Sequence, residues 1–195
     1  MPKILADEQI FSAVMQVVSS RGYSGSTTKQ LADAANISEV TLFRKYGSKA
    51  QLVKQAISFI LEQTDFATAA RYTGNIETDL LNIVQAYQES AVKHGLFFAT
   101  LFSEVSRHPE LVDSIEGPLT IFHSIVELIA RYQTEGKLQR EHPSLTVAAL
   151  LGPLIFTSMM SNATPNVSIP PVEFRTHVKL FLMGRDPQYS HNYLL

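Results

Sequence analysis

Residues Thr27–Lys49 read TTKQLADAANISEVTLFRKYGSK and carry the clearest structural signals of the chain. Gln30 follows Thr27 at the spacing of a capping box, in which two side chains satisfy backbone donors at a helix start. Asn36 tolerates the left-handed backbone that ends a helix, and Ser38 is a good N-cap for the next one. The stretch therefore predicts two short helices, 27–35 and 39–46, joined by a tight turn. This is the pattern of a helix-turn-helix.

The second of these helices has apolar residues that cannot all share one stripe. Leu42 and Tyr46 lie four positions apart and can pack inward, which leaves short side chains and cations facing a partner. A helix that enters the DNA major groove needs such a mixture, for base edges near its start and phosphates further along. We therefore predict that helix 39–46 is a recognition helix.

A third helix is predicted to start at Ser48, with Gln51 completing a second capping box, and to run to about Gln63. Its N-terminus, bearing Lys49, suits a phosphate oxygen. The residues predicted to contact DNA are Thr27, Thr28, Lys29, Ser38, Glu39, Val40, Thr41, Phe43, Arg44, Lys45, Tyr46 and Lys49. Alternatives stay open for some of them. Lys45 and Lys49 are also consistent with solvated surface charges, and Glu39 fits either a contact with cytosine or a favourable place on the helix dipole.

The order of these residues resembles the N-terminal DNA-binding domain of the TetR family of transcriptional regulators. The resemblance covers residues 10–52 and rests on fixed spacing of the following positions: Arg21-Gly22-Tyr23, Thr27, Leu31-Ala32, Ala35, Ile37-Ser38, Thr41-Leu42-Phe43, Tyr46, Ser48-Lys49 and Leu52. Three departures are Asn36 for the common Gly, Phe43 for the common Tyr, and Glu39-Val40 where Lys and Gly are frequent. The departures at Glu39 and Val40 mean that the family's base-reading pattern does not transfer directly.

The rest of the chain predicts an all-α protein of about nine helices, because apolar residues recur at spacings of three and four. We expect one helix to end at His94-Gly95 and a separate helix to cover 96–107. Pro153 is expected to kink or divide a later apolar helix, and Pro170-Pro171 to start the last one. The expected domains are a DNA-binding domain at 1–50, an effector-binding and dimerisation domain at 51–184, and a tail at 185–195.

Charge is distributed unevenly along the 195 residues. The whole chain carries 16 Lys and Arg against 18 Asp and Glu, a formal charge of −2. Residues 1–50 hold six cations and four anions, a net charge of +2, so the remainder carries −4. A weakly basic segment on an acidic body fits a small domain that faces DNA.

The sequence argues against several other classes of protein. Cysteine is absent, which excludes disulfides and thiolate metal sites. There is no G-x-S-x-G, H-E-x-x-H or dinucleotide fingerprint, and Gly47-Ser48-Lys49 lacks the spacing of a P-loop. We therefore expect no enzymatic activity, no catalytic residue, no metal and no cofactor.

A cytoplasmic location is expected. Asp7 and Glu8 interrupt the apolar N-terminus, so the chain shows no secretion signal. The longest nearly apolar run, 147–160, is shorter than a membrane span requires and contains Gly152-Pro153. We expect no membrane partner.

The last two long helices are apolar on most sides and need a partner surface. The resemblance implies that they pair with the same helices of a second subunit, and that the homodimer reads a palindromic operator in double-stranded DNA. We place Phe181 in this interface.

The resemblance also implies a small-molecule site whose occupation releases a repressor from its operator. Aromatic residues of the middle helices favour an apolar or aromatic effector, and Tyr87, Phe98, Phe102 and His123 are the candidates for its site. The aromatic residues among them are more typical of ordinary core packing, and a lone His on a helix is more typical of the surface or of a satisfied core position. The alternative function is a DNA-binding protein of the same fold that acts through a protein partner without any effector.

Overall fold

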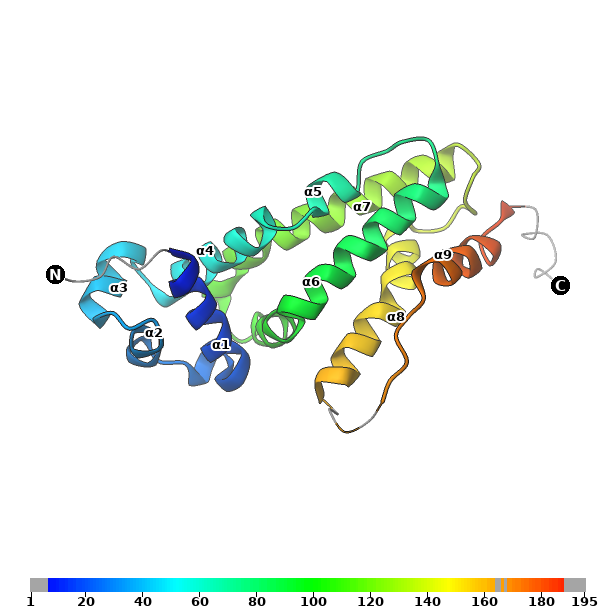
Figure 1. Cartoon of the computed structure of the whole chain (residues 1–195). Coiled ribbons are helices and arrows are strands. Elements are labelled where there is room, and N and C mark those ends of the chain that lie inside the picture. Colours follow the sequence, from blue (N-terminus) through cyan, green and yellow to red (C-terminus); the bar gives the residue numbers. More distant parts are fainter. Residues whose placement is uncertain (1–6, 164–165, 167, 188–195) are drawn as a thin grey trace. The chain divides into compact units, whose positions relative to one another are not determined.

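The chain is built from helices alone within the residues that the computed structural model describes, 7–163, 166 and 168–187 (Figure 1). The helices are α1 Asp7–Gly25, α2 Thr28–Ala34, α3 Glu39–Tyr46, α4 Lys49–Glu62, α5 Phe66–Ala69, α6 Ile76–Glu104, the 3-10 helix η1 Pro109–Ile115, α7 Glu116–Thr134, α8 Pro143–Ala163 and α9 Phe174–Met183. The predicted all-α fold with about nine helices is confirmed. The predicted tail lies outside the described residues beyond residue 187.

The described residues pack as two units, each with its own core. The first unit comprises Met1–Gln63 and His94–Leu119, and the second comprises Thr64–Lys93 and Thr120–Leu195. The division predicted at residue 50 follows the helix-turn-helix rather than this packing, because α4 and η1 pack together with the N-terminal helices. Residues 1–50 remain our prediction for the segment that binds DNA.

The core of the first unit is formed by α1, α2, α3 and α4 together with the end of α6 and η1. Val14, Leu31 and Val53 are fully buried at its centre, and Leu101 and Leu111 join them from much later in the sequence. The α1 helix bends near its end, where Gly22 has a φ of 75°, a backbone conformation that side chains disfavour. Beyond this kink α1 continues for one more turn, to Gly25.

The core of the second unit contains one buried acid. Asp79 is fully buried and accepts hydrogen bonds from the Tyr132 hydroxyl at 2.5 Å and from the backbone N–H and hydroxyl of Thr73 at 2.8 and 2.5 Å. Three donors satisfy a carboxylate that would otherwise be costly to bury. The contact ties the loop before α6 to α7.

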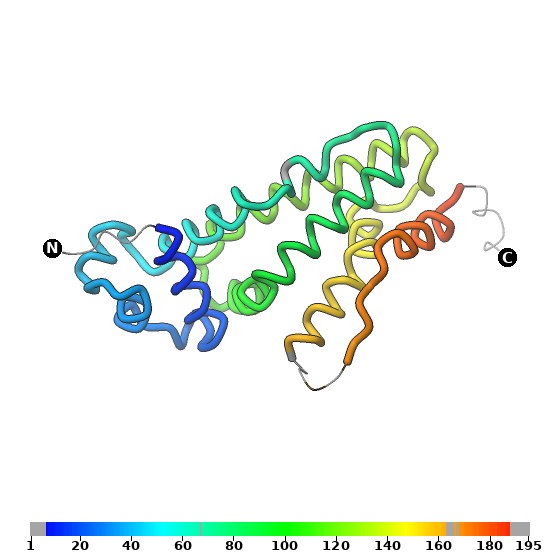
Figure 2. The backbone as a smooth tube through the Cα atoms, viewed as in Figure 1, coloured from blue at the N-terminus to red at the C-terminus, as the bar shows by residue number. Residues whose placement is uncertain are grey.

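The α6 helix passes through Gly95 without a break, so the predicted helix end at His94-Gly95 was wrong. Figure 2 shows α6 as one continuous coil. A glycine inside a helix costs only about 1 kcal/mol. Packing on both sides outweighs this cost, because Leu80 and Ile83 are buried in the second unit while Phe97 and Leu101 are buried in the first.

The α8 helix is longer than the apolar run from which it was predicted. It begins at Pro143, contains Pro153 without being divided, and continues to Ala163. Its segment Pro143–Asn162 is long and apolar enough to cross a membrane by length and composition, but only 28% of that window is buried within the chain. The apolar run 147–160, itself shorter than a membrane span, therefore lies within a longer apolar helix. Most of this apolar window is therefore not buried within the chain.

The last helix begins later than predicted. Glu173 accepts hydrogen bonds from the backbone N–H groups of Arg175 and Thr176 and so caps α9 at Phe174. The imidazole Nε2 of His177 lies 2.7 Å from the carbonyl oxygen of Leu150, which joins α9 to α8.

Candidate nucleic-acid interface

The two helices of the motif begin at the predicted caps. The Thr27 hydroxyl accepts from the backbone N–H of Gln30 at 3.2 Å, and the Gln30 side chain accepts from the backbone N–H of Thr27 at 2.9 Å, which completes the capping box. Ser38 caps α3 by accepting from the backbone N–H of Thr41 at 3.1 Å. Between the helices, Asn36 has a φ of 52°, as the predicted turn requires. The predicted helix-turn-helix is confirmed.

The inner face of α3 anchors the helix to the first unit. Leu42 is buried, as predicted, and Tyr46 is only 5% exposed. The Tyr46 hydroxyl donates to Asp7 Oδ1 at 2.7 Å. Burial raises the pKa of this phenol, and the hydrogen bond to Asp7 adds to the effect. Tyr46 therefore supports α3 from behind, and its phenol is engaged away from any partner surface.

The outer face of α3 carries the side chains that a groove could receive. Val40 is 76% exposed, and Phe43 and Arg44 are exposed beside it. Among the described residues no hydrogen bond or ion pair engages Arg44, whereas Lys45 pairs with Asp7. An unpaired guanidinium next to two exposed apolar groups suits contact with a base edge or a phosphate.

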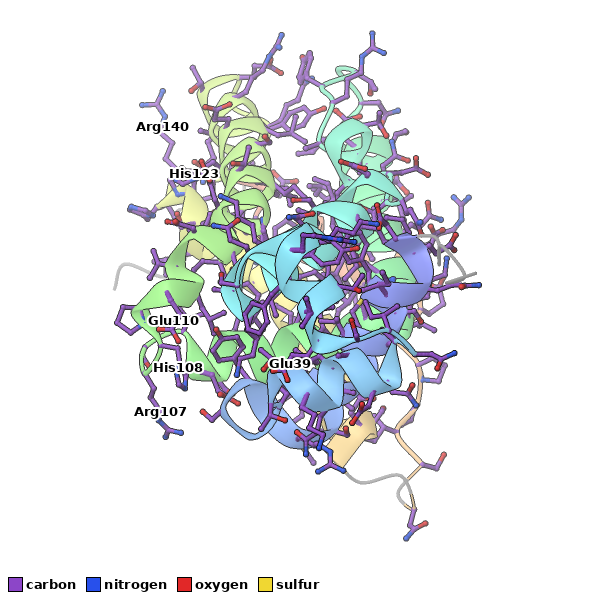
Figure 3. All side chains as sticks on the ribbon, turned by 90° about the vertical axis from the view of Figure 1, so that its left-hand side faces the viewer. Glu39, Arg107, His108, Glu110, His123 and Arg140 are labelled. Atoms are coloured by element: carbon purple, nitrogen blue, oxygen red, sulfur yellow. The ribbon has the colours of Figure 1, made fainter. Side chains whose placement is uncertain are left out.

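Several polar residues predicted to contact DNA hold each other in place. The Thr28 hydroxyl donates to Glu39 Oε1 and so links the start of α2 to the start of α3. The hydroxyls of Ser38 and Thr41 lie 2.8 Å apart. Figure 3 shows the labelled Glu39 side chain on this part of the chain. The carboxylate at the start of α3 is therefore oriented by a residue of α2.

Lysines of the motif differ in their surroundings. Lys29 is exposed on α2. The ammonium of Lys49 instead turns inward, donating to the carbonyl oxygens of Tyr23 at 2.6 Å and Ser26 at 2.9 Å. It also lies 3.9 Å from the centroid of the Tyr23 ring. Ser48 caps the start of α4. The backbone N–H groups there, rather than the Lys49 ammonium, are the donors that suit a phosphate.

The four residues predicted for an effector site do not gather within either unit. Phe98 and Phe102 belong to the first unit and stack with ring centroids 6.4 Å apart, and Phe102 is exposed. Tyr87 and His123 belong to the second unit, where burial raises the pKa of the Tyr87 phenol. An open hollow in the second unit is lined by none of them; its lining residues are Gln85, Gln88, Glu89, Val92, Lys93 and Phe174.

Two acidic residues that were not predicted from the sequence support the helix-turn-helix from within the first unit. The Asp7 carboxylate accepts hydrogen bonds from the side chains of Lys45 and Tyr46. The Glu104 carboxylate accepts hydrogen bonds from the backbone N–H groups of Tyr23 and Ser24. These partners lie 38 to 81 positions apart in the sequence, so no local pattern announces them. In the described part of the chain no group of three or more His, Asp or Glu side chains could hold a metal ion.

Comparison with known proteins points to one family. Residues 10–56 match the sequence model of bacterial regulatory proteins of the tetR family. The HTH-type transcriptional regulator YvkB of Bacillus subtilis, itself uncharacterized, is 26% identical over 191 residues, which cover 91% of this chain and 96% of YvkB.

Solved structures share the fold at lower sequence identity. A Clostridium perfringens protein, provisionally named a fatty acid metabolism regulator, superposes with a TM-score of 0.73 at 19% identity, over 90% of this chain and 95% of its own. AibR, solved in complex with isovaleryl coenzyme A and operator DNA, gives a TM-score of 0.67 at 12% identity, over 93% and 98% of the two chains. At these identities the structural likeness shows the shared fold alone.

Proposed function

The chain belongs to the TetR family of transcriptional regulators, and on this premise we propose that it is a cytoplasmic, homodimeric repressor that a small apolar or aromatic effector releases from a palindromic operator. The helix-turn-helix is the part that binds DNA. The remaining elements of the proposal concern which residues touch the duplex, how two chains associate, and what releases them.

The outer face of α3 carries the proposal. A helix whose ends are capped and whose inner face is anchored by Leu42 and Tyr46 presents Val40, Phe43 and Arg44 outward. Exposed apolar side chains on a short helix gain no burial in water, whereas the methyl group of thymine in the major groove offers them an apolar contact. We assign Val40, Phe43 and Arg44 to the major groove.

Contacts with the phosphate backbone are proposed on either side of this face. Lys29 and Lys45 supply cations, and the N-terminus of α4 supplies backbone N–H groups at Lys49. Thr27, Thr28, Ser38, Thr41 and Glu39 lie at the helix starts, where their capping and bridging bonds fix the angle at which α3 enters the groove. Tyr46 contributes through packing.

The apolar face of α8 and α9 supports association of two chains. Phe156 is 65% exposed and Leu180 is 62% exposed, and Ile155, Met159 and Met183 are exposed in the same two helices. Large apolar side chains exposed on two helices that contact each other favour a surface that a partner covers. Phe181, which we had placed in this interface, is only 6% exposed and packs in the core of the second unit. Phe156 and Leu180 take its place in the proposal.

A small-molecule effector is proposed by analogy with the fold. AibR, which shares this fold, was solved with isovaleryl coenzyme A and operator DNA together. In this chain Tyr87 and Phe98 are half-buried, whereas Phe102 and His123 are exposed. Burial raises the pKa of the Tyr87 phenol. Phe98, Phe102 and His123 remain proposed effector contacts.

Selection of bound duplexes from a random DNA pool, at moderate and at high salt, tests the proposal. We expect a palindrome whose half-sites are centred about 34–36 Å apart or a multiple of that distance, because two recognition helices on a dimer read successive turns of one groove. Binding should weaken steeply at high salt. Recovery of sequences without a shared motif would instead favour the alternative, in which the protein acts through a protein partner.

A further inference from the structure

A single carboxylate holds the turn that precedes the helix-turn-helix. Glu104, the last residue of α6, accepts hydrogen bonds from the backbone N–H of Tyr23 at 2.8 Å, the backbone N–H of Ser24 at 2.8 Å and the Ser24 hydroxyl at 2.9 Å. Its side chain is 13% exposed. A carboxylate can accept several such bonds at once, and each is stronger than a neutral hydrogen bond.

The backbone at Gly22 is shaped to let this carboxylate approach. Gly22 has a φ of 75°, and a Cβ built on it would overlap the Oε1 atom of Glu104. Any other residue would meet both an unfavourable backbone conformation and a direct clash. The close approach of Glu104 therefore depends on the glycine that bends α1.

His108 and Glu110 close the other side of the cluster. The Nε2 atom of His108 lies 2.6 Å from the Ser24 hydroxyl, and its Nδ1 atom lies 3.3 Å from Glu110 Oε1. The imidazole also packs edge-on against the Tyr23 ring, with centroids 5.1 Å apart. Figure 3 shows the labelled His108 and Glu110 side chains next to each other.

The order Ser24, His108, Glu110 matches that of a nucleophile, a base and an orienting acid, but the surroundings do not fit catalysis. The backbone N–H groups of Tyr23 and Ser24, which could otherwise stabilise an oxyanion, already donate to Glu104. A carboxylate therefore occupies the place where negative charge would develop, which opposes acyl transfer. The contacts of Glu104 and His108 therefore stabilise the Tyr23–Ser24 turn.

The turn that Glu104 binds positions the two helices on either side of α3 in the sequence. The carbonyl oxygens of Tyr23 and Ser26 receive the ammonium of Lys49, the first residue of α4. The Ser26 hydroxyl donates to the carbonyl oxygen of Tyr23 at 2.8 Å, and the next residue, Thr27, caps α2. The starts of α2 and α4 are thus both fixed to the segment that Glu104 binds.

We propose that Glu104 is a positioning residue for DNA recognition, which sets the placement of the helix-turn-helix by binding the Tyr23–Ser24 turn from the end of α6. The inference rests on sequence-specific DNA binding by this chain. Base contacts require placement of α3 within a fraction of an ångström, whereas contacts with phosphates tolerate more. Loss of the carboxylate should therefore reduce specific binding more than non-specific binding.

The test compares the wild-type protein with Glu104→Gln, using the selected operator and an unrelated duplex of the same length. Glutamine keeps the shape of the side chain but offers one acceptor oxygen in place of two. We expect operator affinity to fall about tenfold and affinity for the unrelated duplex to change less than about twofold, so that the specificity ratio falls. A variant that is partly unfolded would lose both affinities by the same factor.

Glu116→Gln is the matched control, because it makes the same chemical change in the same unit, at a carboxylate 3.4 Å from Lys54. It should keep the wild-type ratio. Ser24→Ala is a second variant, at an exposed residue, that removes one of the three donors to Glu104 together with the hydroxyl contact to His108. It should lower the ratio by about threefold. This variant carries the test if Glu104→Gln does not fold.

The outcomes separate the two proposals. A wild-type protein that binds both duplexes equally would overturn specific recognition and the role of Glu104 with it. A specific wild-type protein whose ratio is unchanged in folded Glu104→Gln, or in Ser24→Ala, would overturn the positioning role alone.

Discussion

The ammonium nitrogen of Lys49 lies 2.6 Å from the carbonyl oxygen of Tyr23 and 3.9 Å from the centroid of the Tyr23 ring. Burial lowers the pKa of this lysine, and the negative charges of Glu104 and Glu110 oppose the shift. A lysine at the start of α4 is therefore part of the internal structure of the first unit, although its place in the sequence predicts a cation that faces DNA.

Replacing Lys49 with alanine should lower the free energy of unfolding by about 1–3 kcal/mol, because the carbonyl oxygens of Tyr23 and Ser26 lose their donor. Urea unfolding followed by circular dichroism measures the change. Lys29→Ala, which removes an exposed lysine from α2, should stay within about 0.5 kcal/mol of the wild-type value. Equal stability of the two variants would show that the inward contacts of Lys49 contribute nothing.

Replacing Arg44 with alanine should weaken operator binding by about 1–3 kcal/mol, since its guanidinium is exposed on the outer face of α3 and suits a guanine edge. Thermal stability should not change. Repeating the DNA selection should show relaxed preference at one position in each half-site. Arg71→Ala removes an exposed arginine from the second unit and serves as the control. Uniform weakening across all sequences would make Arg44 a phosphate contact instead.

The contribution of Glu104 to stability should depend on pH. Burial alone would raise the pKa of this carboxyl, but hydrogen bonds from Ser24 and Tyr23 outweigh it and lower the pKa below the ordinary value of 4.5. A depressed pKa in the folded state means that the stabilisation is complete above pH 4.5 and is lost as pH falls through the folded-state pKa.

Unfolding free energies of wild type and Glu104→Gln, measured between neutral pH and about pH 3.5, test this linkage. The difference between the two proteins should be constant near neutral pH and should shrink in the acid part of the range. A difference that does not depend on pH would mean that the ionised form of Glu104 is not what holds the turn.

Replacing Phe156 with glutamate should produce monomers, because a charge on the exposed apolar face of α8 cannot be buried against a second chain without a large cost. Sedimentation velocity measures the change, and tight operator binding should be lost with the dimer. Val92→Glu places the same charge on an exposed apolar site of α6 and should leave the association state unchanged.

The core position Phe181 should behave differently from Phe156. Phe181→Ala should lower the free energy of unfolding by about 3–5 kcal/mol, as expected for a buried aromatic residue. A dimeric Phe156→Glu protein would remove α8 from the proposed interface.

The motif could be predicted from the sequence because its signals are local. A capping box joins residues three positions apart, so Thr27 with Gln30 predicts a helix start without knowledge of the rest of the chain. Ser38 predicts the next start as an N-cap residue. The left-handed turn at Asn36 follows from the residue itself. Predictions that needed the orientation of a long side chain were less successful, as the inward ammonium of Lys49 shows.

Local signals did not predict how far the long helices extend or which of their apolar side chains are buried. Gly95 and Pro153 are local breakers, yet α6 and α8 continue through both. Phe181 and Leu180 are neighbours of similar apolar character, and only packing decides that Phe181 enters the core while Leu180 stays exposed.

The helical class, the position of the helix-turn-helix and the caps that start its helices follow from local sequence, since they depend on backbone preferences and on bonds between near neighbours. The support of α3 by Asp7 and the binding of the turn before α2 by Glu104 depend instead on the packing of distant segments. Those bonds join groups up to 81 positions apart, and they form only once packing of the two segments has brought donor and acceptor within about 3 Å.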